Sequence, residues 1–160
     1  MEYALLQAVF LPLLLSPVAY IIGRKFGPTP AMWFTFAVLL YATILVITAS
    51  LDGTYEEHYP WTGAFGEFGF LLDGLASPFA IMIYVLCTIL ALYSKPYMIH
   101  KFHEQYEEEQ KQVHTTSQTL VESSSLSNYV NAKSGLYFAL YLVFAMGMLG
   151  TVLALSLIHI

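Results

Sequence analysis

Four long apolar runs constrain this chain more than any other feature of its sequence. They cover about residues 4–22, 31–50, 74–94 and 135–154, and none contains Asp, Glu, Lys, Arg or His. A helix of ~20 residues crosses the ~30 Å hydrocarbon core of a bilayer, whereas a soluble amphipathic helix presents a polar face to water. Only 11% of the residues are charged, well below the ~25% typical of soluble domains. The runs therefore predict an all-α membrane protein with four transmembrane helices.

The first run contains two prolines, Pro12 and Pro17. In lipid, the backbone groups that a proline leaves unpaired need partners on neighbouring helices, so this helix is predicted to be kinked and packed. A signal peptide is the alternative interpretation. However, Glu2 stands where a positive segment would begin, and no small-residue cleavage site follows. We therefore expect a retained membrane span.

The basic residues occupy only two of the segments between the runs. They are Arg24 and Lys25 after the first run, and Lys95, Lys101, Lys111 and Lys133 between the third and fourth. Loops rich in Lys and Arg stay on the cytoplasmic side, so loops 23–30 and 95–134 are predicted to be cytoplasmic. The 51–72 connection has acids but no Lys or Arg. It and the N-terminus are therefore predicted to lie outside, in a multi-pass protein of the cell membrane.

The two longer connections differ in composition. The outer one mixes turn residues with aromatics, which predicts a short interfacial β-hairpin between the second and third helices, with Tyr59, Trp61 and Phe65 at the membrane boundary. In the inner one, the charged stretch Lys101 to Lys111 is compatible with a solvated helix. The Ser/Thr-rich stretch Thr115 to Ser127 predicts a flexible loop.

The sequence contains few residues that could bind a metal or a cofactor or act in catalysis. One cluster of potential metal ligands stands in the inner connection: His100, His103, His114, Glu104, Glu107, Glu108 and Glu109. It has no fixed spacing typical of a zinc site, so we interpret it as a solvated charged stretch. Cys87 lies alone within an apolar run, and no cofactor motif occurs. We predict no catalytic residue, metal or cofactor in this chain. The net charge of -5 offers no basic surface for a nucleic acid.

The connection into the third run carries a motif, Leu72-Asp73-Gly74-Leu75, after a predicted hairpin. Two further elements accompany it: Leu11-Pro12-Leu13-Leu14 in the first run, and Tyr93-Ser94 with Tyr97-Met98 after the third. Together they resemble the L and M antiporter-like membrane subunits of complex I, the NADH-quinone oxidoreductase. These are related to subunits of multisubunit sodium/proton antiporters and membrane-bound hydrogenases. Two features depart from the family pattern: Ala76 replaces a common serine, and the Glu104 to Asn131 segment is longer than usual.

The resemblance implies a function and a set of partners. It implies the N-terminal part of a proton-translocating subunit that couples quinone reduction to proton transport, with other membrane-arm subunits and the lipid bilayer as partners. Quinone and redox centres are expected on those other subunits, and the titrating groups of the proton path beyond residue 160. Asp73 is expected to cap the third helix. The motif residues Leu72, Asp73, Gly74 and Leu75 are thus expected to be structural.

Three alternatives stay open at this point. The chain fits a sodium/proton antiporter subunit, a hydrogenase subunit, or a small structural four-helix membrane protein, which the absence of charge within the runs favours.

Gly147 and Gly150 are expected to allow close helix approach. Residues 155–160, Leu155-Ser156-Leu157-Ile158-His159-Ile160, have the composition of a translated sequencing adapter. We expect the natural sequence to be interrupted near Ala154.

Overall fold

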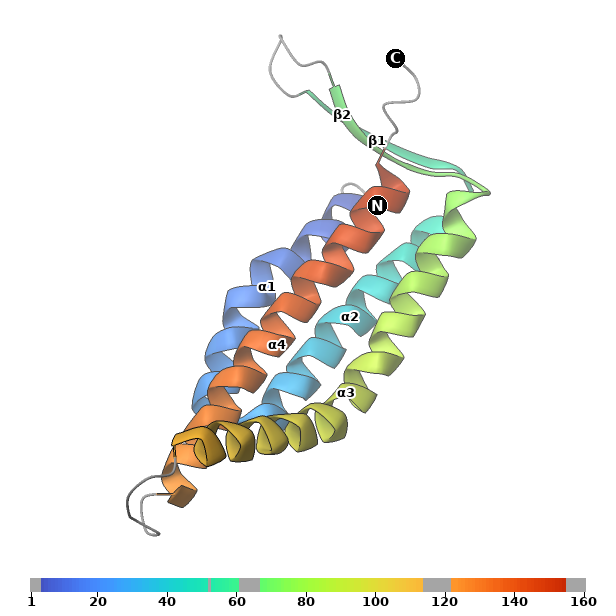
Figure 1. Ribbon diagram of the computed structural model, residues 1–160. Helices are drawn as coiled ribbons and strands as arrows, with labels where there is room; N and C mark the ends of the chain where they lie inside the picture. Colours follow the sequence, from blue (N-terminus) through green and yellow to red (C-terminus); the bar gives the residue numbers. More distant parts are fainter. Residues whose placement is uncertain (1–3, 52, 61–66, 114–121, 155–160) are drawn as a thin grey trace.

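The fold is a bundle of four long helices with a two-stranded sheet at one end (Figure 1). The computed structural model describes residues 4–51, 53–60, 67–113 and 122–154. Its elements, in chain order, are α1 (Ala4–Phe26), α2 (Pro28–Leu51), β1 (Tyr55–Pro60), β2 (Glu67–Leu72), α3 (Ala76–Val113) and α4 (Glu122–Leu153). The predicted fold class is confirmed: all four helices are long and apolar enough to span a membrane, and an antiparallel hairpin joins α2 to α3.

Small residues allow the helices to approach closely. α1 packs against α2 and α4, and α3 packs against the same two helices (Figure 1). The closest approach is at Gly23 of α1 and Gly135 of α4, where a Cβ added to Gly23 would lie 2.4 Å from the Gly135 Cα. The prediction for Gly147 was wrong, since nothing lies within 4 Å of an added Cβ there, and Gly150 makes only an ordinary contact with Val9. Among the described glycines of α4, Gly135 makes the close helix contact.

The link between α1 and α2 is much shorter than the predicted 23–30 loop. α1 continues to Phe26 and α2 begins at Pro28. Gly27 alone separates them, with a φ of 91° that only glycine adopts readily. Pro28 occupies the first helical position, where a missing N–H removes no helical hydrogen bond. Pro28 and Pro30 therefore lie in the first turn of a helix.

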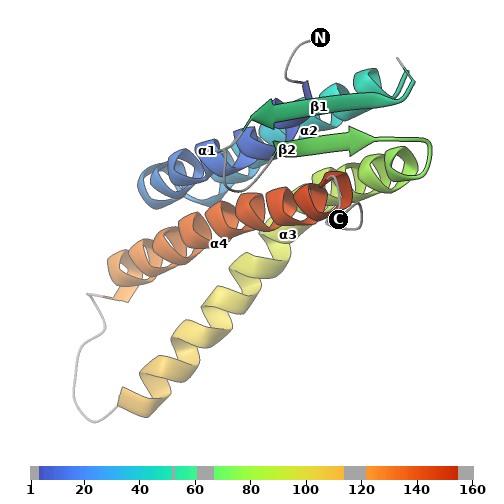
Figure 2. The same cartoon turned by 90° about the horizontal axis from the view of Figure 1, so that it is seen from above.

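Most of the described part of the 95–134 connection is helical. α3 continues through Pro96 to Val113 and bends away from the bundle (Figure 2), and α4 already begins at Glu122. Residues 101–111 are helical, as their charged composition allowed. Of the predicted flexible loop 115–127, residues 122–127 are helical, and residues 115–121 lie outside the described residues. A proline removes one hydrogen bond and bends a helix without having to end it. Packing supports the extension, because Phe102 is buried and the rings of Tyr106 and Tyr129 lie 5.4 Å apart.

A tyrosine of α3 repairs the break that Pro12 makes in α1. The carbonyl of Ala8 would accept a hydrogen bond from residue 12 in a regular helix, but proline has no N–H to give. The Tyr84 hydroxyl donates a hydrogen bond to this carbonyl oxygen, and the Tyr84 side chain is fully buried. The prediction of a proline-containing helix that is completed by its neighbours is thus confirmed at Pro12.

Three more side-chain hydrogen bonds join pairs of helices. Ser16 Oγ of α1 donates to the Ala139 carbonyl of α4 at 2.9 Å. Tyr141 of α4 donates to the Cys87 carbonyl of α3 at 2.7 Å. The hydroxyls of Thr43 in α2 and Thr88 in α3 lie 3.2 Å apart. Such bonds contribute about 0.6 kcal/mol on average in membrane proteins, so several together help to fix how these helices pack.

We predict that Tyr84→Phe destabilises the bundle and that Pro12→Ala relieves most of the loss. Removing the hydroxyl leaves the Ala8 carbonyl without its donor and should lower the free energy of unfolding by about 1 kcal/mol. With alanine at residue 12, a backbone N–H returns to serve that carbonyl. Unfolding by SDS in mixed micelles, followed by circular dichroism, measures all four members of the cycle.

Tyr141→Phe provides the matched control. The Cys87 carbonyl retains its helical donor, the N–H of Ala91, so this substitution should destabilise less than Tyr84→Phe. Equal losses from Tyr84→Phe with proline or alanine at residue 12 would contradict the role assigned to Tyr84.

Candidate functional site

The hairpin formed by β1 and β2 lies across one end of the helix bundle (Figure 1). Its register pairs Tyr55 with Leu72 and Pro60 with Glu67. Phe70 and Leu72 of β2 are buried in the main core, and the Phe70 ring packs edge-on against Phe10 of α1. The predicted boundary residues Trp61 and Phe65 fall outside the described residues. The hairpin is thus part of the folded core at this end.

Asp73 connects the β1–β2 hairpin to α3 and caps that helix. Its Oδ1 accepts hydrogen bonds from the backbone N–H of Leu75 at 3.1 Å and of Ala76 at 2.6 Å. The N–H of Ser77 then donates to the Asp73 carbonyl at 2.9 Å, as in the first helical turn. This is the geometry of an N-cap residue. Because the cap uses the backbone of Ala76, the absence of serine at that position leaves it intact.

The other motif residues have simpler roles in the structure. Leu72 is fully buried in the core, while Gly74 and Leu75 are exposed in the turn before the helix. The motif therefore combines one core side chain, one capping carboxylate and a turn.

A second carboxylate, that of Glu57 in β1, contacts the N-terminus of α1, a pairing that no local sequence pattern predicts. Its Oε1 accepts a hydrogen bond from the Leu5 N–H at 3.1 Å, and its Oε2 accepts one from the Leu6 N–H at 3.0 Å. Glu57 is only 8% exposed. These N–H groups belong to the first turn of α1, where no helical carbonyl is available to accept their hydrogen bonds. Glu57 of β1 therefore caps the N-terminus of α1, although the two elements are far apart in the sequence.

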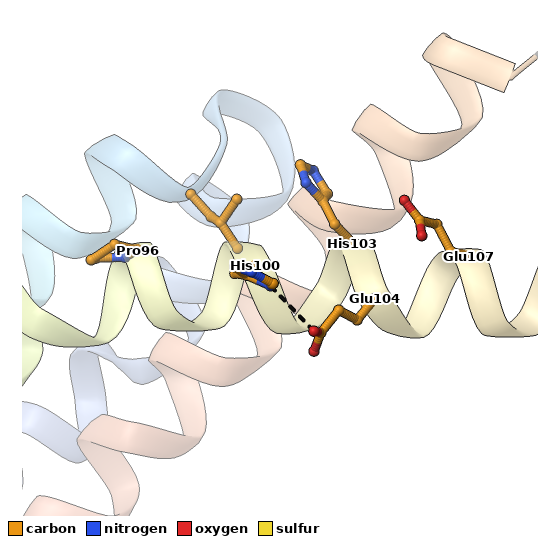
Figure 3. Close-up of a pocket in the computed structure, with 6 residues that line it drawn as sticks. Pro96, His100, His103, Glu104 and Glu107 are labelled. Carbon is orange, nitrogen blue, oxygen red and sulfur yellow. Dashed lines mark ion pairs between the residues drawn. The ribbon is translucent and has the colours of Figure 1, made fainter.

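The candidate metal ligands lie on the bent part of α3, at the opposite end of the molecule. His100, His103, Glu104 and Glu107 share one face of the helix and line an open pocket (Figure 3). The His100 Nδ1 lies 3.6 Å from the Glu104 Oε1, an exposed ion pair if the histidine is protonated. No group of three or more potential ligands among the described residues has the geometry to hold a metal ion. His114 lies outside the described residues.

The interior of the bundle carries hydroxyls and one thiol in place of charges. Tyr84, Thr43, Thr88 and Ser16 are buried, and each makes a hydrogen bond to another polar group. The four runs contain no carboxylate, ammonium or imidazole. A charged group at this depth is costly and usually marks an ion pathway. In the described residues, the buried hydroxyls therefore serve to hold neighbouring helices in position.

Comparison with known proteins identifies relatives of this chain. The chain is 30% identical over 117 residues to NAD(P)H-quinone oxidoreductase subunit 5, chloroplastic, of Acorus calamus var. americanus, a match that covers 62% of this chain. The corresponding proteins of Lemna minor and Nymphaea alba are 32% identical over 119 residues and 35% identical over 95 residues, covering 62% and 56% of this chain. The resemblance to antiporter-like subunits of complex I is confirmed by these homologues.

The match covers only a small part of the relatives. The chain spans 16% of the length of the Acorus and Lemna proteins and 13% of the Nymphaea protein. No protein-family model matches the chain, and no solved structure matches it.

We predict that Asp73→Ala destabilises the protein, whereas Asp73→Asn does not. Alanine removes the oxygen that accepts two backbone hydrogen bonds and should lower the free energy of unfolding by about 1 kcal/mol. Asparagine keeps an acceptor oxygen and caps helices about as well as aspartate. The same SDS titration measures both variants. A loss with asparagine as large as with alanine would show that Asp73 acts through its charge, not as a cap.

Proposed function

We propose that this chain is part of a proton-translocating, membrane-arm subunit of a respiratory NADH-quinone or other donor-quinone oxidoreductase. The similarity to subunit 5 of NAD(P)H-quinone oxidoreductase carries the proposal. The four apolar helices and the capped entry to α3 are compatible with it. In the complete complex, quinone reduction on other subunits would provide the energy that moves protons through this one.

Within such a subunit, the described residues would form a structural region. Tyr84, Tyr141, Thr43 and Thr88 in the membrane-spanning runs each make a hydrogen bond to a carbonyl or to another hydroxyl, and the runs contain no group with an ordinary pKa near neutrality. Protons would therefore be carried by residues elsewhere in the complete subunit. The proposed partners are other membrane-arm subunits and the surrounding lipid.

Co-purification of the full-length gene product tests this proposal. An affinity tag on that protein, extracted in mild detergent, should retain the other subunits of a quinone-reducing complex, as identified by mass spectrometry. Retention of sodium/proton antiporter or hydrogenase subunits alone would favour those related assemblies. Recovery without any membrane partner would favour the structural four-helix protein.

We also propose that the hairpin end of the bundle faces outside and that the other end is cytoplasmic, in the cell membrane. The relatives named above are chloroplastic proteins. The charge distribution supports the orientation, because Arg24 and Lys25 end α1 at the same end of the bundle as the bend of α3 near Lys95 (Figure 1). The hairpin connection contains acids and no Lys or Arg.

Cysteine labelling checks this orientation. With Cys87 replaced by alanine, Thr54→Cys beside the hairpin should react with an impermeant maleimide added outside intact cells. Lys101→Cys on the bent part of α3 should react only after the membrane is opened. Both positions are exposed in the structure, so access depends on the side of the membrane. Reaction of both cysteines from the same side would refute the proposed topology.

A further inference from the structure

The two ends of α1 are held in different ways. At the inner end, Gly23 contacts the backbone of α4 at Gly135 so closely that an added Cβ would clash. Toward the outer end, Pro12 interrupts the hydrogen bonding of the helix, and the outer half, residues 4–11, lies beyond that interruption. A helix bends most easily at such a position. The outer half of α1 therefore depends on contacts from outside the helix for its position.

Two polar contacts from other elements meet this outer half. Tyr84 of α3 donates to the Ala8 carbonyl, one turn before Pro12. Glu57 of β1 accepts from the N–H groups of Leu5 and Leu6, at the start of the helix. The first contact lies beside the interruption and the second at the far end from it. A contact at the far end therefore has a larger effect on the direction of the outer half than a contact beside Pro12.

The Glu57 carboxylate can hold α1 in position because β1, which carries it, is held in place by its pairing with β2. Glu57 stands opposite Phe70 in the hairpin register, and Phe70 packs on Phe10 and pairs with Ala154 beyond α4. The negative charge also faces the positive end of the α1 dipole. A nearly buried carboxylate that accepts two N–H bonds of a helix is a stronger contact than a neutral side chain in its place.

We propose that the outer hairpin is a clamp on the outer half of α1, with Glu57 as the positioning residue that closes it. Closed, the clamp fixes residues 4–11 against α4 and the sheet. When the two hydrogen bonds of Glu57 are lost, the outer half of α1 swings about Pro12, while the Gly23–Gly135 contact keeps the inner half in place. The clamp is a conformational device of the fold and does not depend on the proposed quinone-linked function.

Distance measurements between spin labels test the clamp directly. The chain is reconstituted in liposomes with Cys87 replaced by alanine, and labels are placed at Gln7 of α1 and Met82 of α3, both exposed. A second pair at Lys25 and Tyr93 reports on the inner end. Double electron–electron resonance should show the outer distance distribution broadened and shifted in Glu57→Ala, with the inner distribution unchanged. Glu57→Gln, which keeps one acceptor oxygen, should give a smaller shift.

Glu104→Ala is the matched control, because it removes an exposed carboxylate from the bent part of α3 and should leave both distributions as in the parent chain. An unchanged outer distribution in Glu57→Ala would overturn the proposal. Equal broadening of the inner and outer pairs would also overturn it, since that result describes general loosening of the bundle instead of a swing about Pro12.

Discussion

In a hydrocarbon environment, a backbone carbonyl without a hydrogen-bond donor destabilises the folded protein. The Tyr84 hydroxyl is the donor for the Ala8 carbonyl. α1 itself cannot supply this donor, because residue 12 is a proline. Tyr84 must be on α3, within reach of α1, for Pro12 to be tolerated in its buried position. One hydroxyl thereby links the local chemistry of a proline to the arrangement of two helices that are far apart in sequence.

The remaining contacts follow the same physical logic. Lipid supplies no hydrophobic force between helices, so close packing and specific hydrogen bonds have to hold them. Buried alanines, the Gly23 and Gly135 pair, and the Thr43–Thr88 and Tyr141–Cys87 contacts provide these. The runs themselves contain no charges. Two carboxylates at the hairpin end of the bundle cap helices instead: Asp73 accepts a hydrogen bond at the start of α3, and Glu57 accepts one at the start of α1.

The features that could be predicted from the sequence are those encoded by neighbouring residues. Uninterrupted apolar runs identify the spans, and an aspartate just before a run identifies the α3 cap. The features that were missed depend on tertiary contacts. Glu57 and Leu5 are 52 positions apart, so no local pattern marks their pairing. Pro96 and the charges after it resemble a helix end, but the burial of Phe102 and the contact of Tyr106 with Tyr129 of α4 favour a continued helix. Similarly, glycine content alone could not distinguish Gly135 from Gly147.

The one-residue link at Gly27 has a consequence for how the protein responds to its membrane. α1 and α2 have 23 and 24 residues, nearly equal lengths, and they share one boundary at this link. Neither helix can slide along the bilayer normal without carrying the other. A thinner or thicker bilayer is normally accommodated by helix tilt, and here both helices would tilt about the same link. Hydrophobic mismatch would then change the angle between α1 and α2, while the ends of the two helices at Gly27 stay at the same depth.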